Sequence, residues 1–210
     1  IDNKKMSKSL GNFFTVRDVT SQFDPMVLRF YMLSAHYRSP LNFSKELMQS
    51  AKASLDRILS SIWRLEDLLP RLQEKAVSKE EEESLKKVDE YTALFSEKME
   101  DDLNTADAIT QIFELVRLAN STVKEDSSRA FAEKMKDSIV TLMHVLGIRT
   151  EKKEEKLDAG LEEKVNALIA KRREAKKNKD FSEADRIRDE LLEMGIALKD
   201  TRNGVEWQKI

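Results

Sequence analysis

Residues 44–69 read SKELMQSAKASLDRILSSIWRLEDLL. Their apolar side chains recur at steps of four and three, a spacing that places them on one face of an α-helix. This stripe consists of Leu47, Ala51, Leu55, Ile58, Ile62, Leu65 and Leu69. Ser44 is a favoured helix N-cap, and Pro70 ends or kinks a helix. The stretch therefore predicts a long amphipathic helix that buries one stripe against other helices.

Similar patterns occur along most of the chain. Further helix starts are predicted at Asp24 before Pro25, at Ser78 with Glu81, at Asn104 before Thr105, and at Asp180 with Glu183. The first of these helices is expected to stop near Ser39 and Pro40, and a stripe that ends at Leu146 is closed by Gly147. Because the stripes are short and separated by breaks, they favour an antiparallel bundle over a continuous coiled coil.

The pattern changes after residue 150. Residues 150–158, TEKKEEKLD, are mostly charged and predict a linker. A helix over 161–179 is apolar early and strongly basic late. Residues 196–199 and 205–207 alternate like short strands, and Asn203-Gly204 between them predicts a type I′ hairpin turn. The predicted fold class is mainly α: an antiparallel helical bundle followed by a small α+β module of two helices and a β-hairpin.

Composition excludes several classes of protein. Hydrophobic residues make up 40% and charged residues 36% of the chain, with only 5 Gly and 3 Pro, which favours long helices. Cysteine is absent, so disulfides and thiolate metal sites are excluded. We expect a cytoplasmic protein with no membrane partner, because no long apolar run and no signal-type N-terminus occur. The net charge of -2 says little about partners.

Residues 5–9, KMSKS, carry the chemistry that can be read from the residues alone. Lys5 and Lys8 flank small hydroxyl residues, Ser7 and Ser9. When a nucleoside triphosphate loses pyrophosphate, negative charge builds on the departing oxygens, and ammonium groups that meet them in the transition state lower the barrier. We therefore predict Lys5 and Lys8 as catalytic residues.

Four segments in order carry a resemblance to one family. They are KKMSKSLGNFFTVRDV from residue 4, HYRSPLNFS from residue 36, MEDDLNT from residue 99 and DFSEADRIRDELLEMGIALKDTRNGVEW from residue 180. Together they resemble bacterial cysteinyl-tRNA synthetases, class I enzymes whose nucleotide loop is KMSKS. The family resemblance of this loop implies that ATP is bound by Lys8, Lys5, Ser7 and Ser9. The HIGH motif of that class is absent, and so is the DALR tetrapeptide that names its helical bundle. We therefore expect the C-terminal part of a longer enzyme, inactive by itself.

The resemblance implies a division of the chain and a set of ligands. Residues 1–18 would be the KMSKS loop and the end of a Rossmann-type catalytic domain that otherwise lies upstream. Residues 19–149 would be the stem-contact region and the DALR-like bundle, 150–156 a charged linker and 157–210 the anticodon-binding module. The implied ligands are ATP with Mg, L-cysteine and tRNA(Cys). A zinc ion is expected only in the upstream domain, so no metal ligands are predicted here, and the full-length enzyme is expected to be a monomer.

Contacts to tRNA are predicted from charge and aromaticity. Arg38 can fork onto phosphate oxygens, and basic side chains near the C-terminus can hold a strand while an aromatic stacks on its bases. The predicted tRNA-binding residues are Arg38, Arg172, Arg173, Arg186, Arg188, Lys199, Arg202 and Trp207. For Trp207 the choice between base stacking and core packing stays open.

Other conspicuous residues are given structural roles. We expect His36 to be a structural residue at a helix end, and Trp63 to lie in the core of the bundle. Asp101 and Asp102 precede the helix start at Asn104, so a capping or dipole role is expected for them rather than acid-base chemistry.

Two alternative functions are weighed. A ligase that joins cysteine to an aminosugar in thiol biosynthesis resembles this family, but it needs no anticodon module. A non-enzymatic RNA-binding helical module would have no use for a pyrophosphate loop.

Overall fold

The computed structural model describes residues 5–7, 9, 13–152, 159–178, 180–201 and 204–209. The chain divides into two compact units, Ile1–Glu151 and Lys152–Ile210. Each unit is described by itself below. Within the described residues no helix is both long and apolar enough to cross a bilayer.

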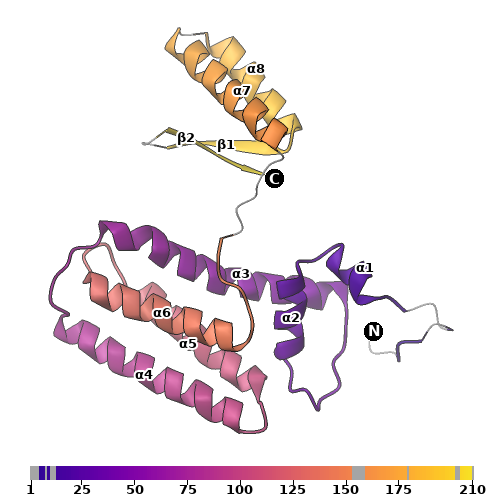
Figure 1. The fold of residues 1–210 in the computed structure, drawn as a ribbon, viewed down its shortest axis with the longest axis vertical. Coiled ribbons are helices and arrows are strands. Elements are labelled where there is room, and N and C mark those ends of the chain that lie inside the picture. Colours follow the sequence, from indigo (N-terminus) through magenta and orange to yellow (C-terminus); the bar gives the residue numbers. More distant parts are fainter. Residues whose placement is uncertain are drawn as a thin grey trace. The chain divides into compact units, whose positions relative to one another are not determined.

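The first unit is an antiparallel assembly of helices (Figure 1). Short helices α1 and α2 come first, and four longer helices, α3 to α6, follow, joined by short connections as in a helical bundle. The bounds are α1 Val16–Thr20, α2 Pro25–Leu33, α3 Lys45–Leu68, the 3₁₀ turn η2 Leu69–Arg71, α4 Lys79–Glu100, α5 Thr105–Thr122 and α6 Arg129–Val145. The expected mainly α fold with a bundle is confirmed.

The helix starts are set by capping side chains. Asp24 accepts a hydrogen bond from the Met26 amide at the start of α2, where Pro25 occupies the first helical position. Ser44 caps α3 and Asn104 caps α5 in the same way. Ser78 and Glu81 form the predicted capping box at the start of α4. These starts were predicted because each cap lies within three residues of the amide that it serves.

Two details of the predicted helices are wrong. The helix α2 ends at Leu33 rather than near Pro40, because Ser34 closes it and residues 36–39 form a turn in which the Ser39 amide bonds to the His36 carbonyl. In α3 the fully buried side chain near the start belongs to Met48, whereas Leu47 is 40% exposed. The buried stripe is therefore shifted by one residue at the start of α3. The helical period alone does not indicate which of the two adjacent apolar residues, Leu47 or Met48, is buried.

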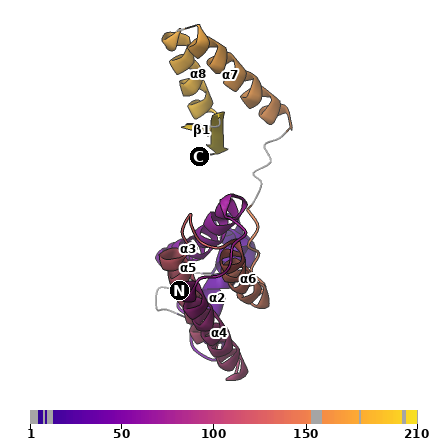
Figure 2. The ribbon, with the colours of Figure 1, turned by 90° about the vertical axis from the view of Figure 1, so that its left-hand side faces the viewer.

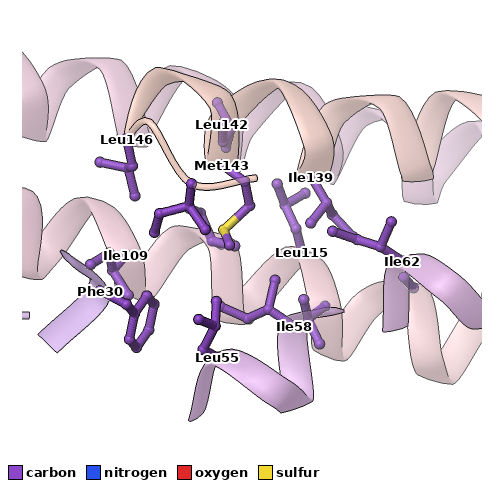
Figure 3. Packing of buried hydrophobic residues seen from close by; sticks show 14 of the residues in the cluster. Phe30, Leu55, Ile58, Ile62, Ile109, Leu115, Ile139, Leu142, Met143 and Leu146 are labelled. Carbon is purple, nitrogen blue, oxygen red and sulfur yellow. The ribbon is translucent and has the colours of Figure 1, made fainter. Parts of the chain in front are cut away.

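The core of the first unit lies between the helices α2 to α6, and α4 contributes its buried side chains Val88 and Phe95. Figure 3 shows Leu55, Ile58 and Ile62 from α3 facing Leu115 from α5 and Ile139, Leu142 and Met143 from α6. Phe30 of α2 packs on Phe113 of α5 edge to face, with ring centroids 6.5 Å apart. Trp63 packs against this core as predicted, and its indole Nε1–H donates to the Thr150 carbonyl over 2.8 Å. Thr150 is buried, so the first unit reaches beyond the residue at which a linker was expected to begin.

The second unit pairs two helices with a hairpin, as expected (Figure 1). Figure 2 shows α7 and α8 together with the first strand of the hairpin, β1. Its elements are α7 Ala159–Lys177, α8 Phe181–Glu193, β1 Ile196–Thr201 and β2 Gly204–Lys209. The helices pack on one another and α8 packs on β1, around a small apolar cluster of Val165, Leu168, Ile187, Leu191 and Ile196. Strand pairing extends to Thr201 opposite Gly204, so Gly204 belongs to β2. The predicted turn residue Asn203 lies outside the described residues.

Candidate nucleotide loop and RNA-binding surfaces

The segment predicted to bind ATP is described only in part. Lys5 and Ser9 are exposed and Ser7 is half-buried, and the Ser7 and Ser9 hydroxyl oxygens lie 2.6 Å apart. Lys8 lies outside the described residues. The described part therefore brings the two predicted hydroxyls together and leaves Lys5 exposed.

The next element in the chain is the helix α1, which begins at Val16. Thr15 and Asp18 form a reciprocal capping box, in which the Asp18 carboxylate accepts from the Thr15 amide over 2.7 Å and the Thr15 hydroxyl accepts from the Asp18 amide. The hydrogen bond from the Thr15 amide, and then that from its hydroxyl, lowers the pKa of Asp18. Asp18 also lines an open pocket of about 560 Å³ with Phe14, Phe23 and Phe43. Sequence reasoning did not predict this pocket, because it depends on how α1 lies against the start of α3.

A second group of polar side chains surrounds Asp102, in the turn between α4 and α5. Its carboxylate pairs with the Arg38 guanidinium over 2.9 Å and accepts a hydrogen bond from the Tyr37 hydroxyl over 2.8 Å. His36 Nε2 lies 3.9 Å from the same carboxylate, and the His36 and Tyr37 rings stack with centroids 4.9 Å apart. We call these four residues, His36, Tyr37, Arg38 and Asp102, the Asp102 cluster.

The Asp102 cluster corrects one sequence prediction. Asp102 was expected to cap a helix or to interact with its dipole, but the cap of α5 is Asn104, and the Asp102 carboxylate instead reaches across to the loop after α2. Donation to Asp102 is the main reason that the pKa of Tyr37 is raised above its ordinary value. His36 was expected at the end of a helix; the structure places it, with Arg38, in the turn beyond α2. No sequence signal links residues 36–38 to a carboxylate more than sixty positions away.

In the second unit, the basic residues predicted to contact RNA differ in exposure. Arg173 in α7 and Arg188 in α8 are exposed, whereas Arg172 is only 6% exposed. Burial takes Arg172 away from the surface on which it was expected. Lys199 lies in β1 opposite Glu206, and Arg202 lies outside the described residues.

Arg186 is also exposed, but it is engaged within its own helix. Its guanidinium donates to both carboxylate oxygens of Glu183 over 2.8 and 2.7 Å and lies 3.7 Å from Glu190. The hydrogen bond from Arg186 lowers the pKa of Glu183. Arg186 is thus partly neutralised, unlike a basic side chain that meets only solvent.

The two aromatic residues of this unit have contrasting environments. Trp207 is half-buried, pairs with Leu198 across the hairpin and packs against the apolar cluster. Phe181 is the first residue of α8 and is 65% exposed. It follows the basic end of α7, where Lys176 and Lys177 are exposed. Sequence reasoning singled out Trp207 for stacking and missed Phe181, whose exposure follows from the position where α8 begins.

Comparison with known families gives this geometry a context. Residues 1–53 match the class I (C) tRNA synthetase catalytic domain, residues 94–151 the DALR domain, and residues 158–207 the cysteinyl-tRNA ligase anticodon binding domain. The loop and α1 thus fall in a class I tRNA synthetase catalytic domain, and the α5–α6 part of the bundle falls in a DALR domain. The match of residues 1–53 is thus to a domain of the class I aminoacyl-tRNA synthetases.

Individual relatives narrow the family. The chain is 52% identical over 209 residues to a cysteine-tRNA ligase of Lachnospira eligens, 50% over 210 residues to one of Clostridioides difficile, and 46% over 214 residues to one of Lachnoclostridium phytofermentans. Each alignment covers 100% of this chain but only 43%, 44% and 45% of the respective relative. The resemblance to cysteinyl-tRNA synthetases is confirmed, and the chain spans less than half the length of these relatives.

Proposed function

We propose that this chain is the C-terminal portion of a cysteine-tRNA ligase, which forms cysteinyl-adenylate from ATP and cysteine and transfers the cysteinyl group to tRNA(Cys). The observation that carries the proposal is the order of the matches. A catalytic-domain match that contains KMSKS is followed by a DALR match and an anticodon-binding match. The anticodon-binding match disfavours the aminosugar ligase, and the catalytic-domain match disfavours a non-enzymatic RNA-binding module.

In this function the first residues act on the leaving group. Lys8 and Lys5 would meet the β- and γ-phosphate oxygens of Mg-bound ATP as charge develops on them, while Ser7 and Ser9 donate hydrogen bonds. Support comes from the exposure of Lys5 and from the proximity of the two hydroxyls. Residues 1–18 would be the end of the catalytic domain.

The remaining residues would hold tRNA. We assign 19–149 to stem contact and the bundle, 150–156 to the linker and 157–210 to anticodon binding. Arg38, Arg173, Arg188, Lys199 and Arg202 remain proposed contacts, Arg186 a weaker one because of its ion pairs, and Arg172 is withdrawn because it is buried. A zinc ion does not fit the described residues, which hold no group of three or more metal-ligating side chains, and the chain has no Cys.

The test uses the full-length protein that contains this chain. It should attach cysteine to a tRNA(Cys) transcript in the presence of ATP. Lys8→Ala should slow adenylation, because it raises the activation free energy of that step by about 2–4 kcal/mol. Lys87→Ala, which removes an exposed lysine from α4, is the matched control and should leave the rate unchanged. Absence of cysteine-dependent pyrophosphate exchange by the parent protein would refute the proposal.

A further inference from the structure

The turn that carries Asp102 has an unusual backbone. Asp102 and Leu103 have φ values of 52° and 54°, in the left-handed region that residues other than glycine seldom adopt. Such conformations persist only where the surroundings hold them. Here the Asn104 amide bonds to the Lys98 carbonyl over 3.1 Å and the Thr105 hydroxyl donates to the Leu33 carbonyl over 2.7 Å. The turn is thus tied both to α4 and to the end of α2, which fixes the direction of the Asp102 carboxylate.

The fixed carboxylate divides its two oxygens between two partners. Oδ1 accepts from the Tyr37 hydroxyl, and Oδ2 pairs with Nη1 of Arg38. The guanidinium carbon of Arg38 lies 5.4 Å from the centre of the Tyr37 ring. Asp102 and Tyr37 therefore hold the Arg38 side chain from two sides.

Most of the Arg38 side chain remains accessible. It is 68% exposed, and among the described residues its only acidic partner within ion-pair distance is Asp102, through Nη1. A guanidinium has five N–H donors in a planar fork, so the remaining donors can engage two oxygens of a phosphate. Because an exposed ion pair of this kind is weak by itself, its main effect is on the orientation of the guanidinium.

We propose that Asp102 is a positioning residue for RNA binding: it orients the Arg38 guanidinium against the Tyr37 ring so that the free edge of the fork receives a backbone phosphate of tRNA. The inference rests on the proposed function, which supplies the RNA partner. It assigns Asp102 no direct contact with RNA. Its effect is transmitted through Arg38.

The proposal and simple electrostatics predict opposite changes in RNA affinity when the Asp102 carboxylate is removed. Removal of a carboxylate beside a polyanion should by itself strengthen RNA binding, because a repulsion disappears. If Asp102 orients Arg38, its removal should weaken binding. Asp101, the adjacent exposed carboxylate at the end of α4, provides a matched control for the charge alone.

The experiment measures the dissociation constant of the full chain for a tRNA(Cys) transcript, labelled for fluorescence anisotropy. Arg38→Ala and Asp102→Ala should each raise it by about tenfold, the size expected for one charge-assisted contact. Asp101→Ala should leave it unchanged or lower it. In the Arg38→Ala background, Asp102→Ala should cause no further weakening, because Asp102 acts through Arg38.

A second variant guards against loss of folding. Asn tolerates the left-handed backbone, so Asp102→Asn should keep the turn and the thermal melting temperature while it raises the dissociation constant. The inference is overturned if Asp102→Asn and Asp102→Ala bind as tightly as the parent, or if the losses from Arg38→Ala and Asp102→Ala add. If the parent itself prefers the transcript no more than polyuridine, the proposed function fails together with the inference, an outcome distinct from tight binding by both Asp102 variants.

Discussion

Glu81 shows how one side chain joins two helix starts. One carboxylate oxygen accepts from the Ser78 amide over 2.9 Å, at the start of α4, and the other accepts from the Ser128 amide over 2.8 Å, at the start of α6. Burial by itself would raise the pKa of Glu81, but hydrogen bonds from the Ser78 and Ser128 amides lower it more, so the net shift is downward from 4.5. The carboxylate is therefore more stable in the folded state than in the unfolded chain.

This linkage gives a prediction with a definite pH dependence. Glu81→Gln should lower the free energy of unfolding at pH 7 by about 1–3 kcal/mol, because a charged acceptor of two backbone amides, of which that of Ser128 is buried, is removed. Since the folded pKa is depressed, the stabilisation is fully present above pH 4.5 and is lost as the pH falls through the folded pKa. Urea unfolding at pH 7 and near pH 3 measures both values. The exposed Glu82→Gln is the control, and an equal loss for both variants, or a pH-independent loss for Glu81→Gln, would contradict the role of Glu81.

At the scale of helices, starts and ends differ in how far the sequence predicts them. Caps such as Ser44 and Asn104 act within three residues, so short patterns identify them. The end of α5 is satisfied from a distance, because Arg64 of α3 donates to the Ala119 carbonyl over 3.0 Å and to that of Val123 over 3.4 Å. Nothing in the spacing of the sequence indicates that pairing. The Asp102 cluster escaped prediction for the same reason.

Loss of the Arg64 guanidinium should therefore affect α5 from outside. Arg64→Met keeps an apolar stem but leaves the carbonyls of Ala119 and Val123 without this donor, and we expect a loss of about 1–3 kcal/mol in unfolding free energy. Arg57→Met, at an exposed position of the same helix, is the control and should change stability by less than about 0.5 kcal/mol. Chemical denaturation of the parent, Arg64→Met and Arg57→Met measures these unfolding free energies. Equal stability of Arg64→Met and the parent would show that water replaces the guanidinium as the donor to these carbonyls.

At the scale of the whole molecule, the two units have cores of very different size. Leu191 and Ile62 are both fully buried, but Leu191 belongs to a cluster of five buried apolar residues among those described, whereas Ile62 belongs to the extended core of α2 to α6. Small cores support less stability, because they remove less apolar surface from water. The change of pattern after residue 150 predicted a larger bundle and a smaller module. Which aromatic residues enter each core depends on the packing, which the sequence pattern does not specify.

Calorimetry should resolve two unfolding transitions, with the second unit melting first. Leu191→Ala should lower only the transition temperature of the second unit, and Ile62→Ala only that of the first. Each shift should correspond to a loss of about 2–5 kcal/mol in unfolding free energy. Each variant is the control for the other. A single transition that both variants shift together would show that the two units unfold cooperatively.

The two aromatics of the second unit should separate RNA binding from folding. Phe181 is exposed beside the basic end of α7, so Phe181→Ala should weaken binding of a tRNA(Cys) transcript by about 1–3 kcal/mol, as expected when one base loses its stacking partner, without a change in melting temperature. Trp207 packs against the apolar cluster, so Trp207→Ala should lower the melting temperature of this unit. Binding and circular dichroism are measured on the same samples.

A third variant tests the contribution of charge in the same unit. Arg173→Ala removes an exposed guanidinium and should reduce the slope of log affinity against log salt by about 0.7–0.9, because one phosphate is no longer neutralised, whereas Phe181→Ala should leave the slope unchanged. Stacking carries no counterion release, so the two variants must differ in this slope if the assignment is right. A folded Phe181→Ala protein with parental affinity, together with a folded Trp207→Ala protein that no longer binds, would reverse the two roles and make Trp207 the residue that stacks on RNA.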